Sequence, residues 1–414
     1  MTNTLIAILV LPFIIFLMRQ VIFTAVIRSK IIHKKPELPK TDFNESNLPT
    51  VTVLCAAHNE ELVISDLLHC LLKVDYPREK LNIFVVNDRS SDKTGHIVNS
   101  FASEYPLLIK VLHRKSTDTP GKPAAIQDAL AQISSDILVV FDADYLPDSQ
   151  IIRKLVAPFE DPDVGATMGR VVPYNYNINL LTHIIDIERK IGYSIDQSAR
   201  QILGLMPQYG GTVGALRLKT LNKIGGMNPR ALAEDTDITI RMYIDGWKIV
   251  YLDHAPCLEE CPESWIVRFR QLQRWSMGHT QCLKYLFRVL QSKHLTKIQK
   301  FDAALLLSFY TLPILYLSII LINIVSFYTT HTYHNFVSVP LAMFFVISAI
   351  ITLAQIALTT DGDKKYDSML YIPFMSLSFL LGIYSVISGF GKIIKSKIFK
   401  KHALRWSKTD RFRK

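Results

Sequence analysis

The chain has 414 residues, a formal net charge of +11 at pH 7 and a mean hydropathy of +0.20. This length predicts two or three structural units. Apolar content and positive charge that are both this high argue against an ordinary soluble enzyme. They favour a membrane protein with basic cytoplasmic loops, and we expect no nucleic-acid partner.

Residues 5–27 are apolar apart from Arg19, Gln20 and a few hydroxyls, and a helix needs about 20 residues to cross a bilayer. A cleaved signal peptide is the alternative, but the segment has no positive n-region and no A-x-A-like site follows it. We predict a transmembrane helix over residues 1–28, in which Arg19 snorkels, faces the protein or marks the membrane boundary. Residues 29–50, basic and then rich in Pro and Asn, form the predicted linker on the cytoplasmic side.

Residues 51–275 contain no stretch long enough to span a membrane, and short apolar runs alternate there with helical patterns. Strands are predicted at 51–56, 83–86, 107–112 and 137–141. The alternation predicts an α/β domain, with a mixed, mostly parallel sheet and flanking helices, inserted between transmembrane helices. Ligands bind at the carboxyl ends of strands in such sheets. The first, second and fourth strands end in the polar clusters HNEE, NDRSSD and DADY.

Two acids, Asp142 and Asp144, follow the fourth strand with one residue between them. Like charges this close repel unless a positive charge lies nearby, and a divalent cation such as Mg²⁺ or Mn²⁺ would also neutralise a departing diphosphate. Lys122, just before a helix N-terminus, could serve phosphates. Asp88, at the end of the second strand, could accept hydrogen bonds from a nucleoside or cap a turn.

A glycine-rich segment, YGGTVGALR at residues 209–217, could bring the backbone close to a ligand. Downstream, Glu234 and Asp235 stand at an apparent helix start, and Asp237 follows on the same turn. Acids at this position can simply stabilise the helix N-terminus. Alternatively, one of them is a general base that takes the proton of an attacking sugar hydroxyl.

The hexapeptide RQLQRW at residues 270–275 places Arg274 beside Trp275. Arginine can bind a diphosphate in a fork, and an indole can stack on a sugar ring. The same pattern also fits one face of an amphipathic helix. Residues 276–301 mix leucines with lysines and arginines and predict an interfacial amphipathic helix, the alternative being a surface helix of the globular domain.

The C-terminal part, residues 302–392, predicts further transmembrane helices. Its uncharged segments are 303–328, 336–358 and 371–390. One span before the domain and three after it would place the C-terminus outside, whereas the basic tail, residues 393–414, favours the inside. We predict that the tail is cytoplasmic and that the segment at 371–390, the shortest and with Pro373 near its start, does not fully cross.

Five motifs in this order, VNDRSSD, FDAD, GGT, AEDTD and QLQRW, closely resemble the membrane-embedded family 2 glycosyltransferases. That group includes the synthases of cellulose, hyaluronan, chitin oligosaccharide and poly-N-acetylglucosamine. The resemblance extends from residue 51 to the last apolar segment. It implies a GT-A fold and inverting, metal-dependent transfer of a hexosyl or N-acetylhexosaminyl group from a UDP-sugar, in the plasma membrane of a bacterial-type cell with the catalytic domain in the cytoplasm.

The resemblance also assigns roles to residues. Asp235 is the expected general base and Asp144 the expected ligand of Mg²⁺ or Mn²⁺. The expected nucleotide-sugar-binding residues are Asp88, Lys122, Asp142 and Arg274. The expected acceptor-binding residues are Gly211, Thr212, Glu234, Gln271 and Trp275.

Three departures from the family pattern affect these expectations. Ala233 replaces the usual Thr before the acidic pair, and His58 replaces a common Tyr at the first strand end, which puts one nucleobase contact in doubt. No cyclic-dinucleotide-sensing domain is recognisable, so regulation of that kind would need an accessory export or regulatory subunit.

Three functions are compatible with the motifs. The first is a processive polysaccharide synthase that exports its product, which the Q-x-x-R-W motif and the apolar segments after it favour. The second is a non-processive membrane glycosyltransferase that adds one or a few sugars to a lipid acceptor. The third is an inactive nucleotide-sugar-binding scaffold, although all the expected acids and the Arg-Trp pair are in place.

Overall fold

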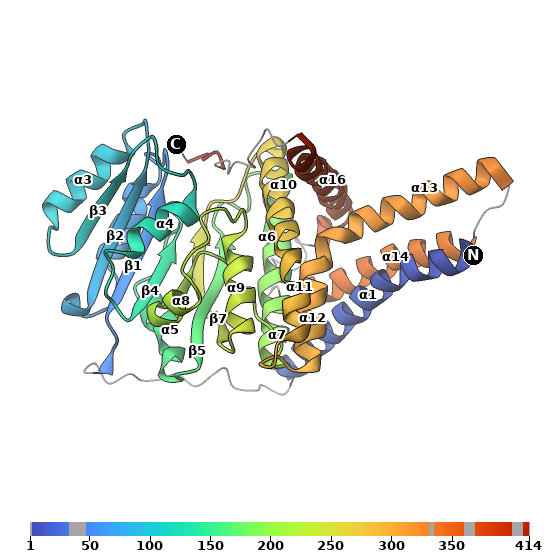
Figure 1. Ribbon diagram of the computed structural model, residues 1–414, viewed down its shortest axis with the longest axis horizontal. Helices are drawn as coiled ribbons and strands as arrows, with labels where there is room; N and C mark the ends of the chain where they lie inside the picture. Colours follow the sequence, from blue (N-terminus) through green and yellow to red (C-terminus); the bar gives the residue numbers. More distant parts are fainter. Residues whose placement is uncertain (1, 33–46, 331–334, 360–368, 400–408, 414) are drawn as a thin grey trace.

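The computed structural model describes residues 2–32, 47–330, 335–359, 369–399 and 409–413. At its centre is a seven-stranded sheet with the order β3-β2-β1-β4-β6-β5-β7 (Figure 1). The strands are β1 (Val51–Ala57), β2 (Leu81–Asp88), β3 (Ile109–Arg114), β4 (Ile137–Phe141), β5 (Val164–Pro173), β6 (Gly214–Arg217) and β7 (Lys248–Glu259). Only β6 runs antiparallel to its neighbours. The predicted mixed, mostly parallel sheet is therefore confirmed.

Helices cover both faces of the sheet (Figure 1). Those of the catalytic unit are α2 (Ile64–Leu72), α3 (Thr94–Glu104), α4 (Lys122–Leu130), α5 (Ile151–Val156), α6 (Leu180–Lys190), α7 (Ser198–Ile202), α8 (Leu218–Lys223), α9 (Glu234–Ile244), α10 (Trp265–Cys282) and α11 (Leu286–Gln291). A π-helical stretch, Ile191–Gln197, joins α6 to α7.

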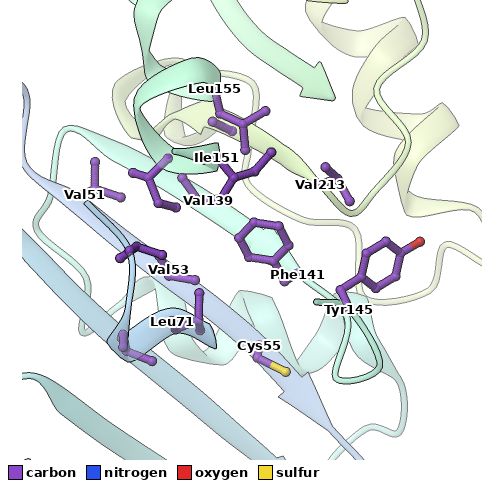
Figure 2. Packing of buried hydrophobic residues seen from close by; sticks show 14 of the residues in the cluster. Val51, Val53, Cys55, Leu71, Val139, Phe141, Tyr145, Ile151, Leu155 and Val213 are labelled. Carbon is purple, nitrogen blue, oxygen red and sulfur yellow. The ribbon is translucent and has the colours of Figure 1, made fainter. Parts of the chain in front are cut away.

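Both faces of β4 are buried, which is why its sequence is an unbroken apolar run. Val139 and Phe141 point into the core that includes α2 and α5, as Figure 2 shows, while Leu138 and Val140 point into the core on the opposite face. This alternation follows from the two-residue period of a strand. The burial fixes where β4 ends, and so fixes the position of the acids that follow it.

The segment at 276–301 differs from the single interfacial helix predicted for it. Residues up to Cys282 belong to α10, α11 follows, and a new helix, α12 (Lys297–Ser308), begins with a capping box formed by Thr296 and Gln299. Tyr285 and Val289 are buried in the core of the catalytic unit because the segment turns back onto α9. Outward-facing apolar residues nearby include Phe287, Leu290, Ile298 and Phe301. Contact with the membrane interface stays a prediction.

The remaining helices are long and apolar. They are α1 (Thr2–Ile32), α13 (Leu312–Thr330), α14 (Asn335–Thr359) and α16 (Met375–Phe399). Three stretches of the described residues are long and apolar enough to cross a membrane, namely Leu9–Ile31, Lys297–Thr329 and Ile372–Ser396. In Figure 1, α1, α13 and α14 extend away from the sheet, whereas α16 lies beside α10. Membrane association is thus supported by the structure.

Arg19 faces the protein, which decides among the three predicted positions for this residue. Its guanidinium lies 2.6 Å from Asp196 and 3.4 Å from Asp302. Arg200 joins the same network through Asp302 at 2.7 Å. The network ties α1 to the π-helical stretch and to α12, and removing any one of its four members would leave an unbalanced charge among the other three.

Helix α10 is in close contact with the loop that leads into α9. A Cβ atom added to Gly278 would lie 2.5 Å from both the nitrogen and the Cβ of Ala233. Since real Cβ contacts are not this short, we expect Gly278→Ala to push α10 away and to lower the free energy of unfolding by about 1–3 kcal/mol. Thermal unfolding of the purified protein in detergent measures the effect.

The matched control is Gly391→Ala in α16, where an added Cβ meets no heavy atom within 4 Å. Alanine is the better helix former, so this variant should be as stable as the wild type or slightly more stable. Equal stability of the two variants would contradict the packing argument.

Candidate active site

A cavity of about 1240 Å³ opens beyond the carboxyl ends of the central strands. Ten of the eleven residues predicted for the site line it. They are Asp88, Lys122, Asp142, Asp144, Thr212, Glu234, Asp235, Gln271, Arg274 and Trp275. The eleventh, Gly211, lies directly behind Lys122, whose Nζ donates to the Gly211 carbonyl at 2.8 Å. The structure therefore brings the predicted residues together.

The two acids after β4 each have a cation of their own. Lys122 Nζ donates to Asp142 Oδ1 at 2.5 Å, and Arg411 Nη1 lies 2.9 Å from Asp144 Oδ2. Asp142 is also held by its backbone N–H, which donates to Thr212 Oγ1 at 3.1 Å. Burial raises the pKa of Asp144 to about 7, against the lowering effect of Arg411. Two side chains thus supply the positive charge that the sequence requires here.

The acids after β4 are the side chains of the cavity that could hold a divalent cation. Among the described residues, no three or more His, Cys, Asp or Glu side chains are grouped to hold a metal by themselves. Mg²⁺ usually needs only one or two protein carboxylates, because substrate phosphates and water complete its shell. Asp144 provides such a carboxylate, only 5% exposed, on the wall of the cavity and already paired with a cationic group. The residues present fit a cation that arrives with a diphosphate.

Helix α9 begins with the acidic pair, and the glycine loop passes close to it. Gly211 has φ = +77°, and a Cβ there would lie 3.3 Å from the Cβ of Asp235 and 3.4 Å from Oε1 of Glu234. Only glycine suits this conformation and this approach. Lys122 Nζ lies 3.7 Å from Oε1 of Glu234, so one ammonium group contacts Asp142 after β4 and Glu234 at the start of α9.

The two candidates for the base, Asp235 and Asp237, differ in their surroundings. Asp235 lines the cavity, and its Oδ1 accepts from the Thr236 backbone N–H at 2.7 Å. Asp237 is only 1% exposed, pairs with Arg241 at 2.7 Å and accepts from the Tyr285 hydroxyl at 2.7 Å. Its carboxylate is occupied by structural contacts, so the geometry favours Asp235.

Asp88 lies at the cavity wall, but its carboxylate is held by protein groups. Arg114 and Arg89 lie 2.6 Å and 2.8 Å from its Oδ1, and the Gly121 N–H donates to its Oδ2 at 3.2 Å. Burial alone would raise the pKa of Asp88, yet the hydrogen bonds from Arg89 and Gly121 outweigh it and lower the pKa. Asp88 therefore joins the segments that carry Arg89, Arg114 and Gly121 at the cavity wall. Its contact with a nucleoside stays a prediction.

The residues of the Q-x-x-R-W motif lie along α10. Gln271 accepts from Arg268 at 2.6 Å. The Trp275 ring lies under two guanidinium groups, those of Arg268 and Arg189, at 5.2 Å and 5.5 Å. Arg274 lines the cavity, and its guanidinium makes no hydrogen bond or ion pair with any described residue. Arg274 is thus the cation of the motif that is available to an anionic ligand.

Sequence reasoning missed other residues of the site. Glu60, buried after β1, and Arg411, near the end of the chain, form an ion pair at 2.8 Å at the cavity wall. Glu60 stands in the HNEE cluster after the first strand but was given no role, and no local pattern marks Arg411, because the pair joins distant parts of the chain. His279, one turn of α10 beyond Trp275, also lines the cavity, and burial lowers its pKa to about 4. Its imidazole is therefore neutral at physiological pH.

The same cavity continues between the apolar helices. Its lining there includes Phe13, Phe16 and Leu17 of α1, Pro313 and Tyr316 of α13, Phe344, Ser348 and Ala349 of α14, and Phe379, Ile383 and Val386 of α16. A chamber with carboxylates, a lysine and arginines at one end is therefore continuous with an apolar passage at the other.

Comparison with known proteins identifies the family. The model of "Glycosyltransferase like family 2" matches residues 49–278. Probable glycosyltransferase YdaM of Bacillus subtilis is 32% identical over 386 residues, which cover 91% of this chain and 90% of that protein. Beta-monoglucosyldiacylglycerol synthase of Trichormus variabilis is 32% identical over 270 residues, which cover 65% of this chain but only 57% of the synthase.

A solved structure with the same fold is a mannosyltransferase of Pyrobaculum calidifontis, determined in complex with GDP-Man and Mn²⁺. It superposes with a TM-score of 0.59 at 18% identity and covers 97% of this chain and 100% of its own. The predicted GT-A fold is confirmed by this likeness, which at such low identity concerns the fold alone.

Family 2 membership, expected from the five motifs, is thus confirmed, and neither relative named here carries the name of a polysaccharide synthase. The strand order of the sheet and the acids at its edge are consistent with the match of residues 49–278 to the family model. The chain belongs to the family 2 glycosyltransferases, enzymes of class EC 2.4.1.- that transfer a sugar from a nucleotide sugar, and it carries long apolar helices beside its GT-A-like domain.

Proposed function

We propose that this glycosyltransferase adds one or a few sugars to a lipid that it takes from the bilayer. This is the second of the three functions compatible with the motifs, and it replaces processive polysaccharide synthesis as the preferred one. The observation that carries the proposal is the continuity of the cavity from Asp235 to the apolar faces of α1, α13, α14 and α16. A lipid with a polar hydroxyl and apolar chains matches both ends of such a passage.

The relatives support the same acceptor class. Beta-monoglucosyldiacylglycerol synthase is named for a glucosylated lipid product. A second such synthase, from Synechocystis, is 30% identical over 279 residues, which cover 58% of its length. Because this chain spans less than two thirds of both synthases, their activity is carried over here only as a proposal. The acceptor proposed is a lipid with a free hydroxyl of the diacylglycerol type.

The proposed chemistry begins at Asp235. Its carboxylate takes the proton of the lipid hydroxyl, and the hydroxyl oxygen attacks the anomeric carbon from the face opposite the diphosphate, so that the configuration inverts. The bond between the anomeric carbon and the diphosphate breaks, and the nucleoside diphosphate leaves. Lys122 and Arg274 lie in the cavity where they can meet the charge of the departing oxygens.

Asp144, with Asp142 beside it, would hold Mg²⁺ or Mn²⁺, which when bound neutralises charge on the leaving diphosphate. Both acids line the same end of the cavity as Arg274. The donor is proposed to be a UDP-sugar, with the catalytic domain on the cytoplasmic side where such donors are made. Since the structural relative holds GDP-Man, a guanosine donor is the alternative to be tested.

The direct test is a donor and acceptor screen with the purified protein in lipid nanodiscs. UDP-glucose, UDP-N-acetylglucosamine and GDP-mannose are each supplied with nanodiscs that contain diacylglycerol, and lipid products are identified by mass spectrometry. We expect a glycolipid with one or a few sugars. A long polymer, formed equally well without diacylglycerol, would overturn the proposal in favour of a processive synthase.

The apolar passage can be tested separately from the donor site. Ala349 lines the cavity on α14, so Ala349→Trp should fill the passage and lower transfer to the lipid about tenfold or more. Its neighbour Ile350 is 59% exposed and does not line the cavity, which makes Ile350→Trp the matched control. Nucleotide binding, measured by calorimetry, should be the same in both variants. Equal transfer rates would contradict the role of the passage.

The identity of the base is tested by removing its charge alone. Asp235→Asn should lower turnover by about 10²–10⁴-fold, the usual contribution of general-base catalysis, and leave donor binding within a few-fold. Asp237→Asn should act on stability instead, because it breaks a buried pair with Arg241. Turnover numbers and thermal midpoints of both variants decide the question. Near-normal turnover of Asp235→Asn would exclude it as the base.

The pH dependence of turnover follows from burial of the acidic pair. Burial raises the pKa of Asp235, while the Thr236 N–H and Lys122 oppose the rise, and Glu234 titrates with it. The base acts only when ionised, so turnover should fall as the pH drops through a value above the usual 3.8 of an aspartate. Lys122→Met should move this acidic limb to still higher pH, as measured by turnover at saturating donor. A limb at the ordinary aspartate value would contradict the assignment.

A further inference from the structure

The last described residues of the chain, 409–413, here termed the tail segment, enter the active site from outside the catalytic unit. Arg411 is bound at the cavity wall by two acids. Its Nε and Nη2 lie 2.8 Å and 3.0 Å from the two carboxylate oxygens of Glu60, and its Nη1 lies 2.9 Å from Asp144 Oδ2. The guanidinium thus bridges the end of β1 to the acid after β4 in a forked arrangement.

Neighbouring residues fix the tail segment in this place. The backbone N–H groups of Phe412 and Arg413 both donate to Glu260 Oε1, at 2.5 Å and 2.9 Å. The Arg413 side chain pairs with Asp66 at 2.5 Å and lies over the Tyr174 ring at 5.0 Å. These contacts involve residues that follow β1, β5 and β7, so the segment is docked on several parts of the sheet edge.

In the docked position, Arg411 covers the carboxylate of Asp144. Its side chain is only 13% exposed, and the Asp144 carboxylate beneath it is 5% exposed. A cation that bound the same carboxylate oxygen would come into contact with a guanidinium of like charge in a poorly solvated site, where repulsion is strong. Arg411 and a divalent cation therefore cannot both be held by this face of Asp144.

We propose that the tail segment is a built-in competitor of the divalent cation, with Arg411 occupying Asp144 in a resting enzyme and leaving it when the cation and nucleotide sugar bind. The inference rests on the proposed role of Asp144 as metal ligand and is independent of the lipid acceptor. It gives the enzyme a regulatory contact, because any partner or condition that holds the tail segment elsewhere raises the affinity of the site for the cation.

The test measures Mn²⁺ binding to the full-length protein in the absence of donor, from the loss of the free-ion signal in electron paramagnetic resonance. Arg411→Gln should bind Mn²⁺ about tenfold more tightly than the wild type, because the ion no longer displaces a bound guanidinium. Arg230→Gln removes the same charge from an exposed loop and is the matched control, with an affinity expected to equal that of the wild type.

Two further measurements separate the possible failures. If Asp144→Asn binds Mn²⁺ as well as the wild type, Asp144 is not the metal ligand and the proposed site falls. If Asp144→Asn loses binding but Arg411→Gln leaves the affinity unchanged, the site stands and the competition is wrong. A weaker affinity of Arg411→Gln for both Mn²⁺ and UDP would also overturn it, since Arg411 would then be part of the donor site.

Discussion

The ammonium group of Lys122 is the interaction on which the active site depends. It contacts Asp142 at 2.5 Å and the Gly211 carbonyl at 2.8 Å, and it lies 3.7 Å from Glu234. These partners come from the end of β4, the glycine loop and the start of α9. Without the ammonium, three or more carboxylates would face one another in a site of low polarity, and their repulsion would push these elements apart. Helix α4 begins at Lys122 and therefore sets the spacing between Asp142 and the acidic pair of α9.

Helix α10 transmits the position of the apolar helices to this site. Arg274 and Gly278 lie one turn apart on the same side of α10, where Arg274 lines the cavity and Gly278 contacts the loop before α9. On α16, the Ser388 hydroxyl accepts from the side-chain Nε2 of Gln273 at 2.6 Å, and Lys392 Nζ donates to the side-chain Oε1 of Gln273 at 2.5 Å. Because these contacts share one helix, a shift of the apolar helices would reach Arg274 and the acidic pair of α9 together. This coupling suits the lipid acceptor that we propose.

The sequence was sufficient for the parts of the fold and site that rest on local patterns. The apolar run of β4 predicted a buried strand with the same bounds, and the acids after it lie at the expected edge. The segment at 276–301 was predicted as one helix because its composition is amphipathic, but the turn between α11 and α12 depends on tertiary burial of Tyr285 and Val289. Arg411 could not be placed by any local pattern, since its ion pairs join residues far apart in the chain.

The position of the tail segment also bears on how often the chain crosses the membrane. Residues 409–413 contact Glu60, Asp66 and Glu260, so the tail segment and the catalytic unit would lie on the same side of any membrane that the apolar helices cross. An even number of crossings must then follow α10. Helices α13 and α14 both extend beyond the sheet, α14 beside α1, and α16 lies along α10 with polar contacts to Gln273 (Figure 1). Two candidate spans, Lys297–Thr329 and Ile372–Ser396, follow the start of α10 among the described residues, which agrees with an even number of crossings. That the segment at 371–390 does not fully cross stays a prediction, because Ile372–Ser396 is itself long and apolar enough to span a membrane.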